Sequence, residues 1–89
     1  MVRMFVRHQV KEYRVWRKCY NNFDAERTGM GVTAAAVYRS ATDPNEITAY
    51  HDFATLTKAK AFAGSPRLKE VMQDAGVKGS PKIWFVKEA

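Results

Sequence analysis

Hydrophobic and polar residues alternate along the first ten positions of the chain, with the period of a β-strand. One face of residues 2–10 carries Val2, Met4, Val6, His8 and Val10, and the other carries Arg3, Phe5, Arg7 and Gln9. Because the first of these faces is mostly apolar, we expect a strand that packs on a core through that face.

From Lys11 onward the apolar positions recur every three or four residues, which is the spacing of a helix. The stripe consists of Tyr13, Trp16, Tyr20, Phe23, Arg27 and Met30. This pattern predicts one helix of about five turns that lays its aromatic stripe on the sheet. Gly29 and Gly31 can adopt left-handed backbone conformations and are expected to end it.

Residues 33–39 and 46–53 form two further predicted strands, and Asp43-Pro44-Asn45 supplies the turn between them. The first of these strands has unusually small side chains, because positions 34–36 are all alanine. Side chains this small either let a helix approach closely or leave room for a ligand.

The second helical region extends from Thr55, whose side chain is suited to cap a helix, to Gly76, which is suited to end one. Gly64 is expected to end or kink the first half, and Ser65-Pro66 to start the second half, since proline is tolerated at the first helical position. A last strand is predicted at residues 82–87, after Gly79-Ser80-Pro81, and it is apolar on both faces.

The order of these elements is β-α-β-β-α-β, so the predicted class is α+β with a ferredoxin-like fold. Residues 1–89 are expected to form a single domain. Right-handed connections give a four-stranded antiparallel sheet in the order 4-1-3-2, with both helices on one face.

The pairing of the first and third strands can be predicted from side-chain complementarity. Placing Arg3 opposite Asp52 and Phe5 opposite Tyr50 gives an ion pair and an aromatic pair on the uncovered face. The same register puts Met4 opposite His51, and it puts His8 opposite residue 47, on the face that the helices cover.

The uncovered face of such a sheet would be a sticky surface on a monomer, because 12% of the residues are aromatic and one core cannot hide them all. We therefore expect a homodimer in which two sheets pack through their open faces and form a dimeric α/β barrel. The net charge of +6 is concentrated in residues 1–20, which indicates either an anionic partner or a solvated helix face.

The cysteine content and the length of the apolar runs indicate where in the cell the protein is expected. Cys19 is the only cysteine, so no internal disulfide can form, and no apolar run is long enough to span a bilayer. A cytoplasmic location without membrane contact is the resulting expectation.

His8 and His51 are the only histidines and therefore the main candidates for chemistry. In the predicted register they lie about 13 Å apart, too far to share a metal ion, so no metal site is expected. His51 is the better catalytic candidate, because it lies in the middle of its strand beside an aromatic wall. The wall is expected to contain Trp16, Tyr20, Phe62 and Trp84, and Tyr38 or Tyr50 could donate a hydrogen bond to a ligand oxygen.

The series Phe53, Thr55, Phe62 and Ser65-Pro66 resembles the third-strand-to-second-helix signature of the antibiotic-biosynthesis-monooxygenase-like proteins in the dimeric α/β-barrel superfamily. Phe53 matches the aromatic residue at the end of the strand, and Thr55 matches the small hydroxyl residue that caps the helix. Ser65-Pro66 matches the Ser-Pro pair with which the signature ends. Phe62 departs from the pattern, because the family has histidine at that position. That departure weakens any transfer of polar chemistry to this chain.

The resemblance implies a homodimer with a pocket between sheet and helices in each subunit. Members include cofactor-independent monooxygenases, cyclases and haem-degrading enzymes. In the monooxygenase case no cofactor is expected, and His51, Tyr38 or Tyr50 would hold a phenolate-like substrate while the aromatic wall excludes water. A haem enzyme would need His8 or His51 as the axial ligand.

The first hypothesis is thus a small-molecule-binding homodimer that acts as a cofactor-independent monooxygenase or cyclase on an aromatic or polyketide-like substrate. The alternative is a non-catalytic dimer that binds a small apolar or aromatic ligand or serves as a sensor. RNA-recognition domains share the strand order, but the third strand has Asp52 where they carry a glycine-containing aromatic motif. Nucleic acid is therefore not expected as a partner.

Overall fold

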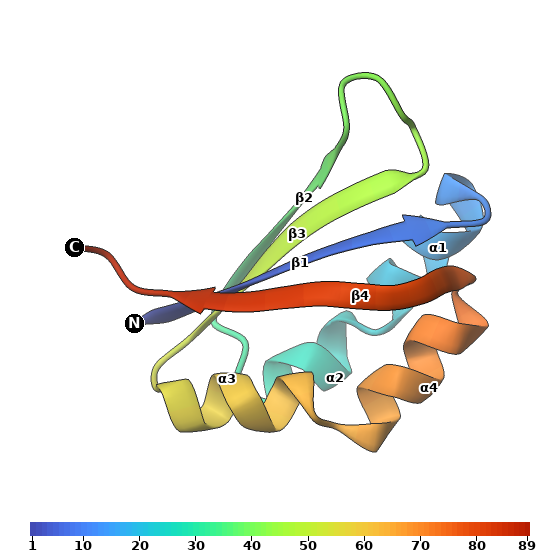
Figure 1. The fold of residues 1–89 in the computed structure, drawn as a ribbon. Helices are drawn as coiled ribbons and strands as arrows, with labels where there is room; N and C mark the ends of the chain where they lie inside the picture. Colours follow the sequence, from blue (N-terminus) through green and yellow to red (C-terminus); the bar gives the residue numbers. More distant parts are fainter.

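The computed structural model describes residues 1–89, and Figure 1 shows its elements along the chain. The strands are β1 (Val2–Val10), β2 (Ala34–Arg39), β3 (Glu46–Phe53) and β4 (Val77–Val86). The helices are α1 (Tyr13–Asn22), α2 (Asp24–Gly29), α3 (Leu56–Ala63) and α4 (Pro66–Asp74). None of these helices has the length and apolar character needed to cross a membrane.

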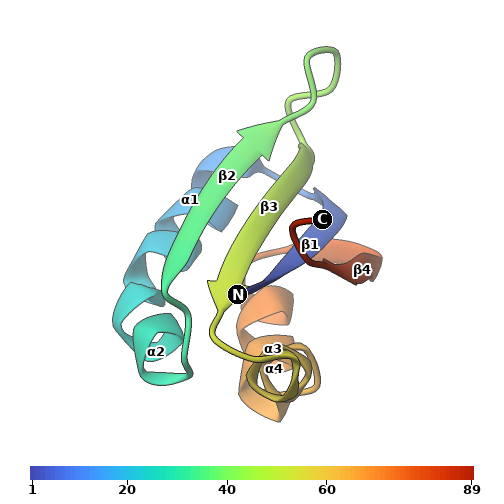
Figure 2. The same cartoon turned by 90° about the vertical axis from the view of Figure 1, so that its left-hand side faces the viewer.

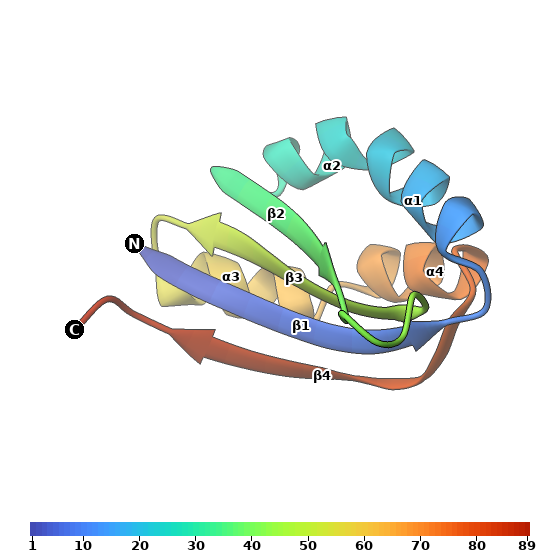
Figure 3. The ribbon, with the colours of Figure 1, turned by 90° about the horizontal axis from the view of Figure 1, so that it is seen from above.

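The sheet has the order β2-β3-β1-β4 with antiparallel pairs throughout, which is the predicted order read from the other edge. The predicted register is confirmed as well: Arg3 pairs with Asp52, Phe5 with Tyr50 and Met4 with His51. All helices lie on one side of the sheet, as the view in Figure 3 shows. The ferredoxin-like fold with one uncovered sheet face is therefore confirmed.

The predicted first helix is divided in two at Phe23, where the backbone turns to φ −87° and ψ −1°. The Phe23 N–H is shared between the carbonyls of Cys19 and Tyr20, and its side chain is buried in the core. α2 then continues the arc of α1 alongside the edge strand β2 (Figure 3) and ends before Gly31, which has φ +102°.

The capping predictions for the second helical region hold. The Thr55 hydroxyl accepts a hydrogen bond from the Lys58 N–H at 3.2 Å, and the Ser65 hydroxyl accepts one from the Leu68 N–H at 3.4 Å. Pro66 opens α4, and Gly76 follows its end with φ +83°.

The predicted start of the last strand was wrong, because β4 begins at Val77. Pairing with β1 runs from Arg3–Val86 to Arg7–Lys82 and resumes at Gln9–Lys78, so residues 79–81 form an irregularity inside the strand. Gly-Ser-Pro is a typical turn signal, and here it marks a bulge that the strand accommodates through φ +66° at Gly79.

The sheet alternation separates two surfaces. The helix-covered face carries the core, whose largest fully buried side chains are Phe53, Phe62, Met4, Ile47, Val6 and Val10. We define the open face as the opposite side of the sheet, which carries Arg3, Phe5, Arg7, Tyr38, Thr48, Tyr50, Asp52, Lys82 and Trp84.

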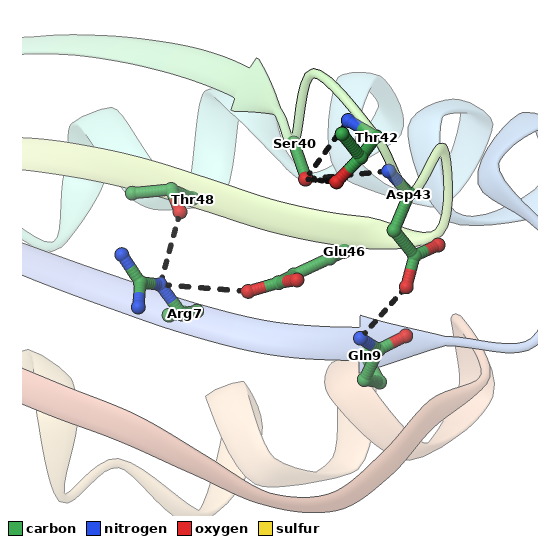
Figure 4. A network of polar contacts seen from close by, with 7 residues as sticks. All are labelled: Arg7, Gln9, Ser40, Thr42, Asp43, Glu46 and Thr48. Carbon is green, nitrogen blue, oxygen red and sulfur yellow. Dashed lines mark hydrogen bonds and ion pairs between the residues drawn. The ribbon is translucent and has the colours of Figure 1, made fainter.

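A polar network ties the β2–β3 loop to β1 (Figure 4). The Gln9 amide donates to Asp43 at 3.1 Å, and Asp43 accepts a second bond from the Asn45 N–H at 2.9 Å. These two bonds, that of the Asn45 N–H first, lower the pKa of Asp43. Arg7 lies between Thr48 and Glu46 in the same network. The contacts fix the register that places both histidines on the helix-covered face.

Candidate functional site

A small cavity lies between the helices and the sheet, and five of the residues singled out in the sequence line it. These are His8, Trp16, Tyr20, His51 and Phe62. The remaining wall is largely apolar and consists of Met4, Val6, Phe23, Arg27, Ala49, Leu68, Val71, Met72 and Ala75. Its volume of about 40 Å³ is room for water-sized molecules.

His51 lines this cavity from β3 and is only 4% exposed. Its Nε2 lies 3.1 Å from the hydroxyl of Tyr20, whereas its Nδ1 has no hydrogen-bond partner. The Phe62 ring, whose centroid is 5.4 Å from that of His51, closes the cavity on the α3 side.

His8 reaches the same cavity from β1 and is 6% exposed. Neither of its ring nitrogens has a hydrogen-bond partner, and the ring meets Trp16 edge-on with centroids 5.6 Å apart. Buried polar atoms are nearly always paired in folded proteins, so three unpaired imidazole nitrogens around one cavity require an explanation.

Both imidazoles are neutral at pH 7. Burial lowers the pKa of His8 to about 4, and burial, together with the charge of Arg27, lowers the pKa of His51 to about 4. A neutral imidazole has one N–H donor and one nitrogen acceptor. The cavity thus offers hydrogen bonds of both kinds to a ligand inside an otherwise apolar wall.

Tyr20 is held on three sides. Its ring stacks on Trp16 with centroids 4.9 Å apart, and the Arg27 guanidinium lies over it at 3.7 Å. Burial raises the pKa of the Tyr20 hydroxyl, so that group keeps its proton and can donate to His51. When it does, the proton of the His51 ring lies on Nδ1, and the cavity contains a free N–H donor.

The other three predicted site residues lie elsewhere. Tyr38, Tyr50 and Trp84 all project from the open face, on the opposite side of the sheet from His51. There Phe5 stacks on Trp84 at 5.4 Å and meets Tyr50 at 6.1 Å. Their roles in ligand binding stay predictions, and the structure does not bring them together with His51 in one chain.

Arg27 is the cavity residue that sequence reasoning left without a role. It is 4% exposed, and its guanidinium donates to the Tyr20 carbonyl and to Asp24. Its position as the one basic residue in a largely aromatic helix stripe was the signal that could have identified it.

No group of three or more His, Cys, Asp or Glu side chains lies together in a way that could hold a metal ion. A haem does not fit the residues present either, because the space beside His8 and His51 is about 40 Å³.

The fold matches those of known structures over nearly the whole chain. A candidate antibiotic biosynthesis monooxygenase from Bordetella bronchiseptica matches with a TM-score of 0.83 at 15% identity, covering 99% of this chain and 96% of that one. A second such candidate, from Nitrosomonas europaea, gives 0.74 at 15% identity and covers 99% and 98%.

SnoaB from Streptomyces nogalater, a cofactor-independent oxygenase, matches with a TM-score of 0.75 at 10% identity, covering 99% of this chain and 94% of that one. No protein-family model and no curated protein matches the sequence. At these identities the comparison establishes the shared fold.

Proposed function

We propose that this chain, whose fold is that of the antibiotic biosynthesis monooxygenase-like proteins, is a homodimer that binds a small hydroxylated aromatic compound beside His51. The cavity of about 40 Å³ is too small for an aromatic ring, so the ligand takes the space that the Tyr20 ring now fills against Trp16. The observation that supports the proposal most strongly is the set of unpaired nitrogens on His8 and His51. A phenolic hydroxyl donates and accepts hydrogen bonds, and its ring suits the surrounding apolar wall.

The proposed homodimer forms through the open face of the sheet, so that the sheet that carries His8 and His51 is packed on both of its sides. The aromatic cluster of Phe5, Tyr50 and Trp84 is only partly buried in the single chain, and Tyr38 is 58% exposed beside it. A second copy packed on this face would remove that apolar area from water.

The reaction we propose is oxidation of the bound phenol by dioxygen without a cofactor, and the shared fold with SnoaB, a cofactor-independent oxygenase, supports this proposal. One oxygen atom forms a C=O bond at a ring carbon in place of its hydrogen, and the phenol oxygen loses its hydrogen and becomes the second C=O group, giving a quinone. The other oxygen atom takes up the two displaced hydrogens and leaves as water, so that dioxygen accepts the four electrons that the ring loses. Nε2 of His51, once the ligand has displaced the Tyr20 hydroxyl, accepts the hydrogen bond of the phenol, and the apolar wall excludes solvent.

A non-catalytic binder is the second candidate, and one observation favours it. A pKa of about 4 makes His8 and His51 weak bases, poorly matched to removing a phenolic proton near pH 7. Such a pocket would recognise a neutral phenol without activating it.

Dioxygen uptake separates the two candidates. The protein is incubated with 1-naphthol and with hydroxylated naphthacenes, and uptake is compared with quinone formation for the natural chain, His51→Ala and Tyr13→Phe. The oxygenase predicts equal amounts of oxygen consumed and quinone formed, lost in His51→Ala and retained in Tyr13→Phe, which changes a tyrosine outside the cavity.

Saturable binding without oxygen uptake would instead identify a binder. Equal rates from the natural chain and His51→Ala would exclude a catalytic role for His51. Absence of binding by all these compounds would contradict the proposed function itself.

A further inference from the structure

A second hollow lies outside the central cavity, between the α1–α2 arc and the edge strand β2. Figure 2 shows these elements side by side along the edge of the sheet. The cleft has a volume of about 370 Å³ and is lined by Arg17, Tyr20, Asn21, Asp24, Arg27, Ala35, Ala36 and Val37. It falls within the size range of ligand sites, whereas the central cavity is far below that range.

Tyr20 and Arg27 line both spaces and therefore form the partition between them. The Tyr20 ring fills a slot with Trp16 on one side, Arg27 on the other and His51 Nε2 at its hydroxyl. These are the contacts that a bound phenol would need. Tyr20 thus occupies a phenol-shaped position next to the catalytic candidate.

Ala35 of β2 leaves the route from the cleft to His51 free of a large side chain on the sheet side. Ala35 pairs with His51 across the sheet, on the same face, and is exposed because neither α1 nor α2 covers it. The small residues at positions 34–36 were compatible either with a closely packed helix or with room for a ligand. At Ala35 no helix packs closely, so the small side chain leaves room for a ligand.

The charge of the cleft favours an anion. Arg27 is 4% exposed, and its one carboxylate partner is Asp24 at 3.2 Å, whose side chain is 77% exposed to water. Arg17 forms no ion pair, and its guanidinium lies 5.5 Å from the centre of the Tyr20 ring. Two guanidinium groups against one solvated carboxylate leave an excess positive charge at the mouth.

We propose that the cleft between α1 and β2 is the entrance to the central cavity and binds the carboxylate of an aromatic hydroxy acid through Arg17 and Arg27. Tyr20 swings aside when the ligand enters, and the ligand's ring takes its place between Trp16 and Arg27. This inference rests on the proposed function and names its substrate class.

A matched pair of probes tests it, 1-naphthol and 4-hydroxy-1-naphthoate, which differ only in a carboxylate at the end of the ring opposite the hydroxyl. Affinities are measured by calorimetry for the natural protein, for Arg17→Gln and for Arg14→Gln. Arg14 lies exposed on the same helix, outside the cleft, so its loss removes an equal charge elsewhere. Imidazole NMR signals report in the same titrations whether His51 loses its contact with Tyr20.

The expected result is that the natural protein binds the naphthoate at least tenfold more tightly than 1-naphthol at low salt. This affinity advantage should fall at least threefold in Arg17→Gln and on addition of salt. It should be kept in Arg14→Gln. Equal affinity for the two probes, or an unchanged advantage in Arg17→Gln, would overturn the inference while the cavity proposal stands. Failure of both probes to bind would overturn the two together.

Discussion

The Tyr20 hydroxyl lies 3.1 Å from Nε2 of His51, so a hydrogen bond across the cavity joins the first helix to the central strand. This single contact closes the site and satisfies one of the four imidazole nitrogens around it, the other three being unpaired. It therefore links the stability of the fold with access to His51.

Tyr20→Phe separates those two effects. Removing the hydroxyl leaves a further buried nitrogen unpaired, which is expected to cost about 1–3 kcal/mol of the free energy of unfolding. The same change removes a bond that a ligand must break on entry, so 1-naphthol should bind several-fold tighter. Denaturant unfolding and calorimetry measure the two quantities.

The control is Tyr13→Phe, a hydroxyl deletion at a partly buried residue that does not line the cavity and should change neither quantity. Unaltered stability in Tyr20→Phe would show that the contact with His51 contributes nothing to the fold.

Stability should fall in mild acid because of the two histidines. Their pKa of about 4 in the folded state is below the ordinary value of 6.5, so between pH 6.5 and pH 4 the unfolded chain binds more protons than the folded one. The free energy of unfolding is then fully retained above pH 6.5 and decreases as pH falls toward 4, by roughly 3 kcal/mol per histidine.

Urea unfolding at several pH values checks this, with imidazole NMR titration of the folded protein in parallel. The double variant His8→Gln, His51→Gln should flatten the profile over the same range. Two imidazoles that titrate near pH 6.5 in the folded protein would refute the buried neutral pair.

His8→Phe distinguishes a binding role from a structural one. Since neither ring nitrogen of His8 has a partner, phenylalanine at that position removes buried unpaired atoms and should raise the melting temperature by several degrees. Naphthol binding should weaken, because one hydrogen-bonding group of the cavity is lost. A variant that is destabilised and binds as well as the natural chain would argue for a purely structural His8.

The open face predicts how the chain associates. The natural protein should sediment at twice the chain mass of 10.1 kDa at micromolar concentration. Trp84→Glu should give a folded monomer, because a charge placed beside Phe5 opposes burial of the aromatic cluster. Lys87→Glu, outside the sheet at the chain end, serves as the control. A natural chain that sediments as a monomer would contradict dimerisation.

The strand register was predictable because it depends on complementary side chains that face each other across neighbouring strands. Arg3 and Asp52 can only meet in one alignment that also pairs Phe5 with Tyr50, and the structure has that alignment, with a bidentate ion pair between Arg3 and Asp52. The helix caps were predictable for a similar reason, since hydroxyl side chains bond to backbone a few residues away.

The parts that sequence could not provide depend on tertiary packing. Residues 83–86 are apolar on both faces, so their pattern could not assign Trp84 to the cavity or to the open face. The division of the first helix at Phe23 depends on how that ring is buried. Tyr20 and Arg27 share the predicted helix stripe, but the contact between Tyr20 and His51 is invisible in sequence, because it joins that stripe to a strand far along the chain.

Ligand binding beside the two histidines is tested by an NMR titration of both imidazole rings with 1-naphthol, since the chain contains only two histidines. Binding there should produce saturable shifts of both the His8 and the His51 signals, with one common dissociation constant. Binding of 1-naphthol that leaves both imidazole signals in place would contradict it, because the ligand would then lie outside the cavity.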